Sequence, residues 1–400
     1  MRKLFIVFMV IVSNTFGQSN LQPIIFKKDT LLFYDTILQP KDPIINQEAM
    51  KNIYDSKIVK HRLDSLNDLT PLSLVFNKVV EQHIKFYLFQ RQDQVSKLLS
   101  LSEYYFPVFE MYLDKNKLPL ELKYLPVIES SLNANARSHA GAVGLWQFMY
   151  PTAKEQGLRI NSYLDERKDI YKSTQAACDY LLKAYKVFNN WDLALSSYNA
   201  GRGNITKAIR RSGGKFNYWE LRPFLPKETS NYIPSFIAAV YIMNFANEHG
   251  IFADDQYKYK KYSIDSVHLN RSIKISHLAK LIEVDTNLLK ALNPVYRVNL
   301  IPSLDNEKFP LILPENKAGF FILNEDSIYL ELEKMELADK LNYPDFTDIE
   351  KIRYKVKKGD FLGKIANKYK CTIKDIMLWN DLKNHNIKIG QRLSIYRTVK

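Results

Sequence analysis

Apolar residues recur at helical spacing from residue 73 to residue 250. In one such stripe, Trp191, Leu195 and Tyr198 lie on the same face of a helix, and Gly201 stands where that helix would end. Similar stripes fill most of the remaining sequence between these limits. The pattern predicts an all-helical domain over residues 73–250.

The pattern changes beyond the helical domain, where segments are shorter, β-branched residues are common and prolines mark turns. Residues 278–293 and 365–380 resemble each other at an offset of 87, and each predicts two short helices flanked by strands. We therefore predict two copies of a small βααβ unit, at 258–315 and 351–398. The Glu-rich segment 316–350 predicts a charged helical connector between them.

The N-terminal part of the chain has no helical stripe of this kind. Arg2 and Lys3 precede a short apolar run, which predicts a secretory signal peptide over residues 1–17. The run is too short for a membrane span, which needs about 20 residues. Residues 18–72 show no sustained period and predict a loosely ordered lead-in. We expect a protein secreted across the inner membrane into the periplasm or cell envelope.

Net charge narrows the range of partners. Lys and Arg outnumber Asp and Glu by 57 to 43, a formal charge of +14. Such a charge favours nucleic acid, anionic lipid or the carboxylates of peptidoglycan. The export signal makes nucleic acid the least favoured of these, so we interpret the basic and aromatic residues 257–262 as an edge strand or linker. We expect a monomer that can associate peripherally with a membrane.

Several other chemistries lack their sequence signals. The chain contains no HExxH metal motif, no phosphate-binding glycine loop and no nucleophile elbow. His139 is isolated, and we expect no metal or cofactor. Cys178 and Cys371 lie in different predicted domains, and we expect two unpaired buried thiols.

One carboxylate occupies an unusual place in the helical pattern. In the segment LPLELKYLPVIESS, Leu122, Leu125 and Glu129 share one helix face, with Glu129 near the helix end. Burial and the negative end of the helix should both raise the pKa of Glu129. A carboxyl group that stays protonated near neutral pH can act as a general acid. A structural Glu with a buried partner fits this pattern equally well, so the spacing alone leaves both readings open.

Four motifs follow in order and carry a family resemblance. The first begins at Glu129 within ESSLNANARSHAGAV, and GLWQFM, ALSSYNAG and ETSNYIPSFIAA come after it. Together they resemble the lytic transglycosylases of the soluble-lytic-transglycosylase/goose-lysozyme superfamily, especially the membrane-bound murein transglycosylase D type. The resemblance covers residues 95–250, and LysM modules extend it to the C-terminus. It implies a mainly α fold, with a lysozyme-like helical catalytic domain followed by small βααβ LysM-type modules.

The resemblance also assigns roles to matching residues. It implies that Glu129 is the catalytic acid/base, that Tyr232 orients it by a hydrogen bond, and that Tyr198 lies beside it. It implies that Ser138 contacts the reacting sugar near its N-acetyl group. The remaining matched residues are expected to bind the glycan, and they are Gly144, Leu145, Trp146, Gln147, Phe148, Asn199 and Ala200.

The matched motifs supply one carboxylate, whereas most glycosidases use two. The resemblance therefore implies non-hydrolytic cleavage of the MurNAc-GlcNAc β-1,4 bond in peptidoglycan glycan strands. Glu129 would act first as acid and then as base, leaving a 1,6-anhydroMurNAc end. A lysozyme-type muramidase that uses water, and a catalytically silent peptidoglycan-binding protein, remain as alternatives.

The C-terminal unit resembles a LysM domain over its full length. In that family two loops bind N-acetylglucosamine chains, and the first corresponds here to Gly359, Asp360, Phe361 and Leu362. The unit at 258–315 lacks this Gly-Asp loop. We therefore interpret it as a degenerate LysM-like module.

Overall fold

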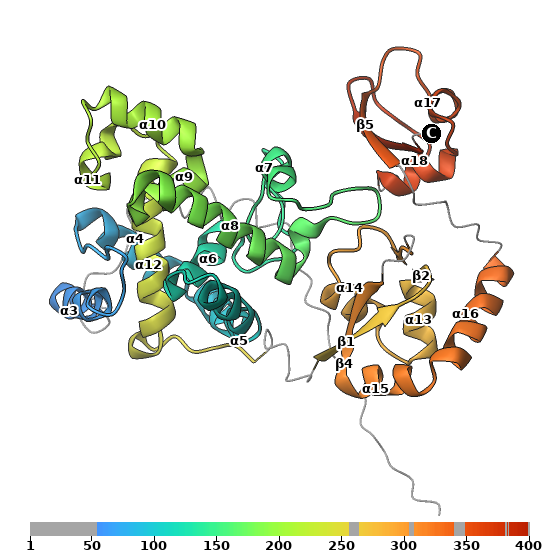
Figure 1. The fold of residues 1–400 in the computed structure, drawn as a ribbon, viewed down its shortest axis with the longest axis horizontal. Helices are drawn as coiled ribbons and strands as arrows, with labels where there is room; N and C mark the ends of the chain where they lie inside the picture. The colour runs from blue at the N-terminus through green and yellow to red at the C-terminus, as the bar shows by residue number, and fades with distance from the viewer. Residues whose placement is uncertain are drawn as a thin grey trace, which may run out of the picture.

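The computed structural model describes residues 54–255, 264–303, 308–339, 349–380, 382 and 384–398. A helical domain is followed by two small modules that contain both helices and strands (Figure 1). This arrangement confirms the prediction of a mainly α fold with small βααβ units. The predicted signal peptide and most of the predicted lead-in lie outside the described residues. Within the described ranges, no helix is long and apolar enough to cross a membrane.

The helical domain is built from α-helices joined by short 3-10 turns. In chain order these are α3 (Ser56–Asn67), α4 (Lys78–Gln90), α5 (Gln92–Lys115), η1 (Leu120–Tyr124), α6 (Leu125–Ser130), α7 (Tyr150–Glu155), η2 (Glu166–Lys168), α8 (Ile170–Phe188), α9 (Trp191–Ala200), α10 (Arg202–Arg211), α11 (Tyr218–Leu221), η3 (Arg222–Phe224), η4 (Thr229–Asn231), α12 (Tyr232–Phe245) and η5 (Asn247–His249).

Helix α12 forms the centre of this domain. Every residue from Tyr232 to Ile242 is buried, as expected for a helix that is apolar on all sides. It packs against α4, α5, α6 and α9 (Figure 1). The catalytic candidate Glu129 lies on α6, so the core helix supports it directly.

The end of the predicted lead-in is ordered, and the prediction for residues 18–72 is wrong there. Helix α3 begins after Asp55, whose carboxylate accepts hydrogen bonds from the backbone N–H groups of Lys57 and Ile58. Val59 and Leu63 are fully buried against the main core. Two apolar positions four residues apart are too few to stand out among polar neighbours, so the sequence pattern missed this helix.

The first module contains the predicted unit of two strands and two helices. Strand β1 (Ile264–Leu269) pairs antiparallel with β4 (Phe309–Pro314), and Ile264 lies opposite Pro314. Between them lie β2 (Ile273–Lys274), α13 (Ile275–Leu281), α14 (Thr286–Leu292) and β3 (Leu300–Ile301), with β2 and β3 paired antiparallel.

The predicted connector over 316–350 belongs largely to this first module, which corrects its assignment. Helices α15 (Glu315–Leu323) and α16 (Glu325–Asp339) contribute buried apolar residues to the module core, among them Phe321 and Leu332. Arg271 also forms a 2.7 Å ion pair with Glu336 of α16. The many Glu residues of this segment indicated a solvent-exposed connector, although its helices also carry the apolar residues that the module buries.

The second module has the same plan as the first. Strand β5 (Ile349–Lys355) pairs antiparallel with β6 (Arg392–Thr398), and α17 (Leu362–Tyr369) and α18 (Ile373–Trp379) lie between them in sequence. Asn380 exchanges two hydrogen bonds with the backbone of Ser394, and Asn293 does the same with Ile312 in the first module. These two asparagines stand at the predicted repeat offset, so the repeat extends to a specific hydrogen-bonding role.

The first module is joined to the helical domain through the loop that precedes η2. The backbone N–H of Asp165 donates to the carbonyl of Val295 at 2.9 Å, and that of Arg297 donates to Tyr163 at 2.8 Å. The side chains of Tyr163 and Leu164 are buried in the core of the first module. The loop before η2 therefore belongs to the helical domain in sequence and packs into the core of the first module.

Candidate active site

Glu129 lies in the last turn of α6, where the sequence pattern predicted it. Its helix is short and follows η1 directly, and Ser131 ends it in the left-handed conformation with φ 54°. The hydroxyl of Ser130 donates to the carbonyl of Leu145 at 2.8 Å. This bond ties the helix that carries Glu129 to the following loop.

The surroundings of Glu129 favour its protonated form. Glu129 is only 6% exposed. This burial raises the pKa of Glu129 to about 8. The nearby Glu228 also raises this pKa, whereas the hydrogen bond from the Tyr232 hydroxyl to Glu129 Oε1 lowers it. Burial outweighs the hydrogen bond, so much of this group is protonated at neutral pH.

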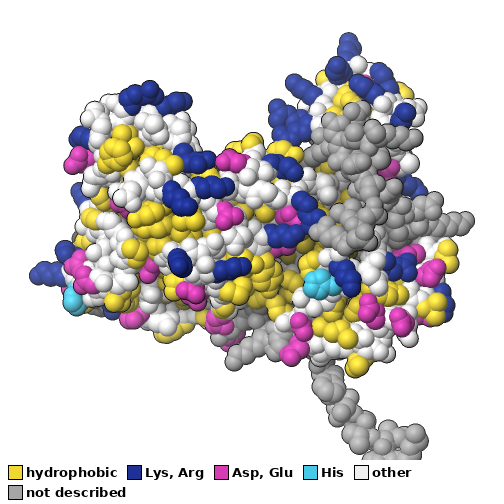
Figure 2. Space-filling view, viewed as in Figure 1, with side chains coloured by type: hydrophobic (Ala, Val, Ile, Leu, Met, Phe, Trp, Pro, Cys, Tyr) yellow, Lys and Arg dark blue, Asp and Glu magenta, His cyan; other side chains and the backbone are white. Residues whose placement is uncertain are grey.

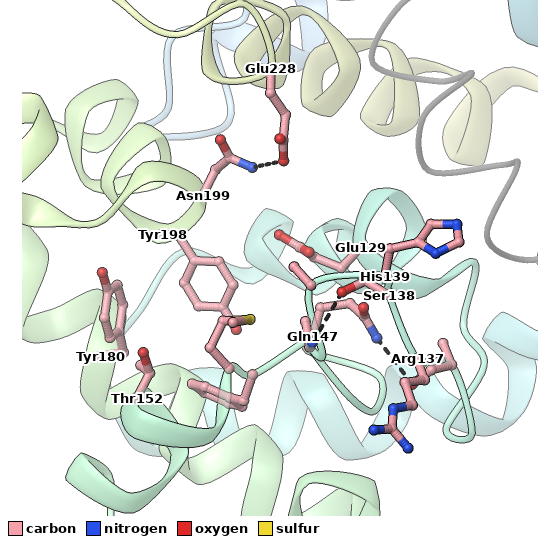
Figure 3. Close-up of a pocket in the computed structure, with 15 residues that line it drawn as sticks. Glu129, Arg137, Ser138, His139, Gln147, Thr152, Tyr180, Tyr198, Asn199 and Glu228 are labelled. Atoms are coloured by element: carbon pink, nitrogen blue, oxygen red, sulfur yellow. Dashed lines mark hydrogen bonds between the residues drawn. The ribbon is translucent and has the colours of Figure 1, made fainter. Parts of the chain in front are cut away.

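A cleft of about 390 Å³ opens at Glu129. In Figure 3, Glu228 and Asn199 lie on one side of it and Ser138 and Gln147 on the other, with Glu129 between them. The cleft collects residues from α6, the following loop, α8, α9 and the segment before α12. This site therefore assembles parts of the chain that are far apart in the sequence.

One side of the cleft is the loop that contains Ser138 and the GLWQF segment. Ser138 accepts a hydrogen bond at its hydroxyl from the Ala142 N–H, and its own N–H donates to the Ala142 carbonyl, both at 3.0 Å. The amide of Gln147 donates to the Gly144 carbonyl at 2.8 Å. Ser138, Gln147 and Phe148 all line the cleft, and their contact with glycan stays a prediction.

Three other residues predicted to bind glycan do not present side chains to the cleft. Leu145 and Trp146 are fully buried in the main core, and Trp146 donates its indole N–H to Thr174 at 3.0 Å. Gly144 has no side chain, and a Cβ there would stand 1.8 Å from the carbonyl oxygen of Arg167. We correct these three assignments, because their geometry holds the loop in place.

The YNAG motif contributes Tyr198 and Asn199 to the other side of the cleft. The hydroxyl of Tyr198 donates to the Trp146 carbonyl at 2.7 Å, which fixes α9 against the GLWQF loop. The amide of Asn199 donates to Glu228 at 2.9 Å and its oxygen accepts from Thr229 at 2.8 Å. Ala200 packs against the main core and does not line the cleft, so its predicted glycan contact is also corrected.

Glu228 and Tyr180 also line the cleft, and neither was among the residues predicted from the sequence. Glu228 opens the quoted motif ETSNY and stands four residues before Tyr232, a spacing that could have identified it. Tyr180 meets Tyr198 edge to face, with ring centroids 5.2 Å apart. The chain contains 25 tyrosines, and nothing in the sequence distinguishes Tyr180 from the others as a cleft residue.

Arg167 supports the cleft from behind. Its guanidinium forms a bidentate pair with Asp165, with contacts of 2.8 and 2.7 Å. The same guanidinium donates to the carbonyls of Gly141 and Phe148 at 3.3 and 3.2 Å. Since the Asp165 N–H is bonded to Val295 of the first module, the loop that lines the cleft is braced by that module.

The predicted glycan loop of the second module is only partly exposed. Asp360 accepts hydrogen bonds from the Tyr354 hydroxyl at 2.6 Å and from the Lys357 N–H at 2.8 Å. Leu362 is buried in the module core, whereas Phe361 is 62% exposed. Gly359 precedes them with a φ of 83°. Asp360 and Leu362 thus hold the loop, and Phe361 is the side chain available to a ligand.

The described residues contain no group of three or more His, Cys, Asp or Glu side chains placed to hold a metal ion. Cys178 and Cys371 are both free thiols, as predicted, although Cys371 is only half-buried. The cleft at Glu129 is lined by carboxyl, hydroxyl and amide groups, among others.

Comparison with known families identifies each body separately. Residues 107–220 match the Transglycosylase SLT domain, residues 263–330 match the LysM-like domain of lytic transglycosylase MltD, and residues 354–395 match the LysM domain. The chain thus contains an SLT domain followed by a LysM-like domain and a LysM domain. The second match includes α15 and part of α16, in agreement with their place in the first module.

Two curated relatives match over much of the chain. They are the membrane-bound lytic murein transglycosylase D of Escherichia coli strains K12 and O6:H1, each 28% identical over 287 residues. The alignment covers 70% of this chain and 61% of those proteins, so it spans less than two thirds of their length. A putative tributyltin chloride resistance protein of Alteromonas sp. (strain M-1) is 38% identical over 106 residues, which cover 26% of this chain and 51% of that protein.

Among solved structures, the 70 kDa soluble lytic transglycosylase of Escherichia coli matches with a TM-score of 0.32 and 21% identity. The match covers 44% of this chain and 32% of that one.

Proposed function

We propose that this protein is a peptidoglycan lytic transglycosylase with Glu129 as its one acid/base. The observation that carries the proposal is a buried carboxyl at the floor of a cleft, with a pKa raised to about 8 and a hydrogen bond from Tyr232. The SLT domain match over residues 107–220 and the likeness to murein transglycosylase D support it.

In the first step Glu129 acts as general acid. Its proton passes to the glycosidic oxygen between MurNAc and GlcNAc, and the bond from C1 of MurNAc to that oxygen breaks. The electron pair leaves with the oxygen, and C1 becomes electron-deficient. The N-acetyl group of the same sugar stabilises C1 until it is attacked. Ser138, which lines the cleft, is the proposed contact for this N-acetyl group.

In the second step the ionised Glu129 acts as general base. It removes the proton from the C6 hydroxyl of the same MurNAc, and that oxygen forms the new bond to C1. The proton lost in the first step is thereby restored, and no water is consumed. An attack within one sugar ring has the high effective concentration of intramolecular reactions. The product is a 1,6-anhydroMurNAc end.

A muramidase that uses water is the second candidate, because the structure adds a carboxylate that the sequence motifs did not assign. Glu228 lines the same cleft as Glu129, and two carboxylates across a cleft are the usual apparatus of glycoside hydrolysis. The side-chain amide of Asn199 donates a hydrogen bond to the Glu228 carboxylate at 2.9 Å. We favour the transglycosylase because the Glu228 carboxylate is engaged by Asn199, whose amide oxygen in turn accepts a hydrogen bond from Thr229. Glu228 thus has a structural role in joining α9 to the segment before α12.

The proposal extends to the glycan contacts, to the role of the LysM domain and to the location of the enzyme. We propose that Phe148, Gln147 and Asn199 contact the glycan in the cleft, and that the LysM domain retains the enzyme on the wall through the loop around Phe361. The predicted signal peptide supports a location in the periplasm or cell envelope. A monomer is sufficient for the chemistry, since all the groups named come from one chain.

Mass spectrometry of the fragments released from purified sacculi tests the reaction. Anhydro ends are expected, and Glu129→Gln should reduce their release by at least about a hundredfold. Reducing ends that disappear in Glu228→Gln would instead establish the muramidase. Binding without release would leave a wall-binding protein, and full activity of Glu129→Gln would refute the assignment of the acid/base.

A further inference from the structure

A second cleft, of about 440 Å³, lies where the helical domain meets both modules. The helical domain contributes Lys168 and Asn135, the first module contributes Lys290, Arg297 and Asn287, and the second module contributes Leu378. Among the described residues that line it, three carry positive charge, others are amides, and none is a carboxylate. Figure 2 shows Lys and Arg side chains at this junction.

Two cations of this cleft, Lys168 and Arg297, lie close enough to influence each other. The pKa of Lys168 is lowered, first by burial and also by Arg297, Arg167 and Arg137, whereas Asp165 opposes this effect. The Asp165 carboxylate is already paired bidentately with Arg167. An anion that entered the cleft would therefore meet cations without displacing a resident carboxylate.

The basic cleft shares a wall with the candidate active site. Asn135 lines the basic cleft, and Ala136 and Arg137, the next residues, line the cleft of Glu129. The ammonium of Lys168 donates to the Asn135 side-chain oxygen at 2.9 Å. Because Asn135 and Ala136 are consecutive residues, the two clefts adjoin along this part of the chain, and an extended peptide advances about 3.3 Å per residue.

We propose that the basic cleft binds the peptide branch of the wall polymer through its free carboxylates while the glycan lies in the cleft of Glu129. The inference rests on the proposed function for the identity of the ligand. Cations suit the carboxylates of the peptide, and amide side chains suit its peptide groups. A bare strand keeps only the lactyl carboxylate of each MurNAc, which is held close to the sugar and does not extend away from it as the peptide does. Peptide-bearing strands are then preferred over bare strands.

Lys290 and Lys280 provide a matched pair of variants to test this proposal. Both are exposed lysines of the first module, on α14 and α13, and only Lys290 lines the basic cleft. Lys290→Glu and Lys280→Glu change the net charge equally. Each is combined with Glu129→Gln, so that the dissociation constant (Kd) of a soluble glycan fragment is measured without cleavage.

Isothermal titration compares fragments that carry the peptide with the same fragments after an amidase has removed it. We expect Lys290→Glu to weaken binding of the peptide-bearing fragment roughly five- to tenfold relative to the bare fragment, and Lys280→Glu to leave that ratio unchanged. Equal binding of both fragments by Glu129→Gln, or an equal effect of the two lysine variants, would overturn the proposal. Failure of the proposed function would show separately, as no release of product by the unmodified enzyme.

Discussion

Glu129 combines the two properties that a general acid needs, a proton at neutral pH and a fixed direction. Burial supplies the first, and the nearby Glu228 adds to it. The hydroxyl of Tyr232 supplies the second at some cost to the first, because its hydrogen bond stabilises the ionised form. The balance between these two effects makes pH a direct probe of the site.

The raised pKa of Glu129 should make the free energy of unfolding depend on pH. The folded-state pKa of Glu129, about 8, lies above its ordinary value of 4.5, so the folded protein holds this proton more tightly than the unfolded chain. The resulting stabilisation is complete below pH 4.5 and is lost as the pH rises through 8. Urea unfolding at pH 5 and pH 9 should show a loss on the order of a few kcal/mol that Glu129→Gln lacks. Equal losses in both proteins would contradict the raised pKa.

Tyr232→Phe tests the orienting hydrogen bond. Removing the hydroxyl removes the interaction that lowers the pKa of Glu129, so the alkaline limb of the kcat/KM profile should move to higher pH. The rate at the optimum should fall roughly tenfold or more, since the carboxyl loses its fixed direction. A tyrosine with only a packing role would lower the rate without moving the limb. Tyr87→Phe, a change at another buried tyrosine of the main core, is the control.

At the scale of elements, the loop over residues 137–148 depends on a close approach to η2. Gly144 has a φ of 90° and no room for a Cβ, because the Arg167 carbonyl lies against it. Gly141 has a similar φ of 93° but open space around its Cα. The two glycines therefore separate backbone strain from steric conflict within one loop.

We predict that Gly144→Ala lowers the free energy of unfolding by about 3 kcal/mol or more, whereas Gly141→Ala costs about 1 kcal/mol. Glycan release should also fall further in Gly144→Ala, because Ser138 and Gln147 move with the displaced loop. Thermal unfolding and the release assay on both variants measure these differences. Equal effects of the two substitutions would show that the contact with Arg167 is unimportant.

At the scale of the whole molecule, the two modules have different relations to the helical domain. The first module bonds to the loop before η2, and Asp165 and Arg167 pass that support to the cleft. The second module presents an exposed Phe361 at its predicted glycan loop. We therefore propose that the first module positions the active site and that the second module retains the enzyme on the wall.

Phe361→Ala tests retention. Phe361 is 62% exposed, so its loss should leave the melting temperature nearly unchanged while weakening binding to sacculi. Phe252, 63% exposed at the end of the helical domain, is a matched control. We expect a roughly three- to tenfold loss of sacculus binding in Phe361→Ala and none in Phe252→Ala. Equal retention of both variants in a sedimentation assay would exclude this loop as the contact.

Local patterns in the sequence were sufficient for most of the helices and strands, and the motif resemblance was needed for the acid/base candidate. Helical spacing depends on neighbours three or four residues apart, so the stripe through Trp191 and Tyr198 predicted α9, and the repeat placed both modules. The resemblance of four motifs then pointed to Glu129, Ser138 and Tyr232. The short helix α3 and the core-forming face of α16 escaped, because few apolar residues among many polar ones give a weak periodic signal.

The arrangement of the cleft depended on contacts between distant residues, which no local pattern contains. Tyr232 bonds to Glu129 across 103 positions, and Asn199 bonds to Glu228 across 29. Membership of the GLWQF motif did not reveal that Trp146 turns into the core while Gln147 lines the cleft. The basic cleft is the clearest case, because Lys168 and Lys290 are unremarkable surface lysines until the fold brings the bodies together. Burial and charge at each site are properties of that packing, and they set the chemistry.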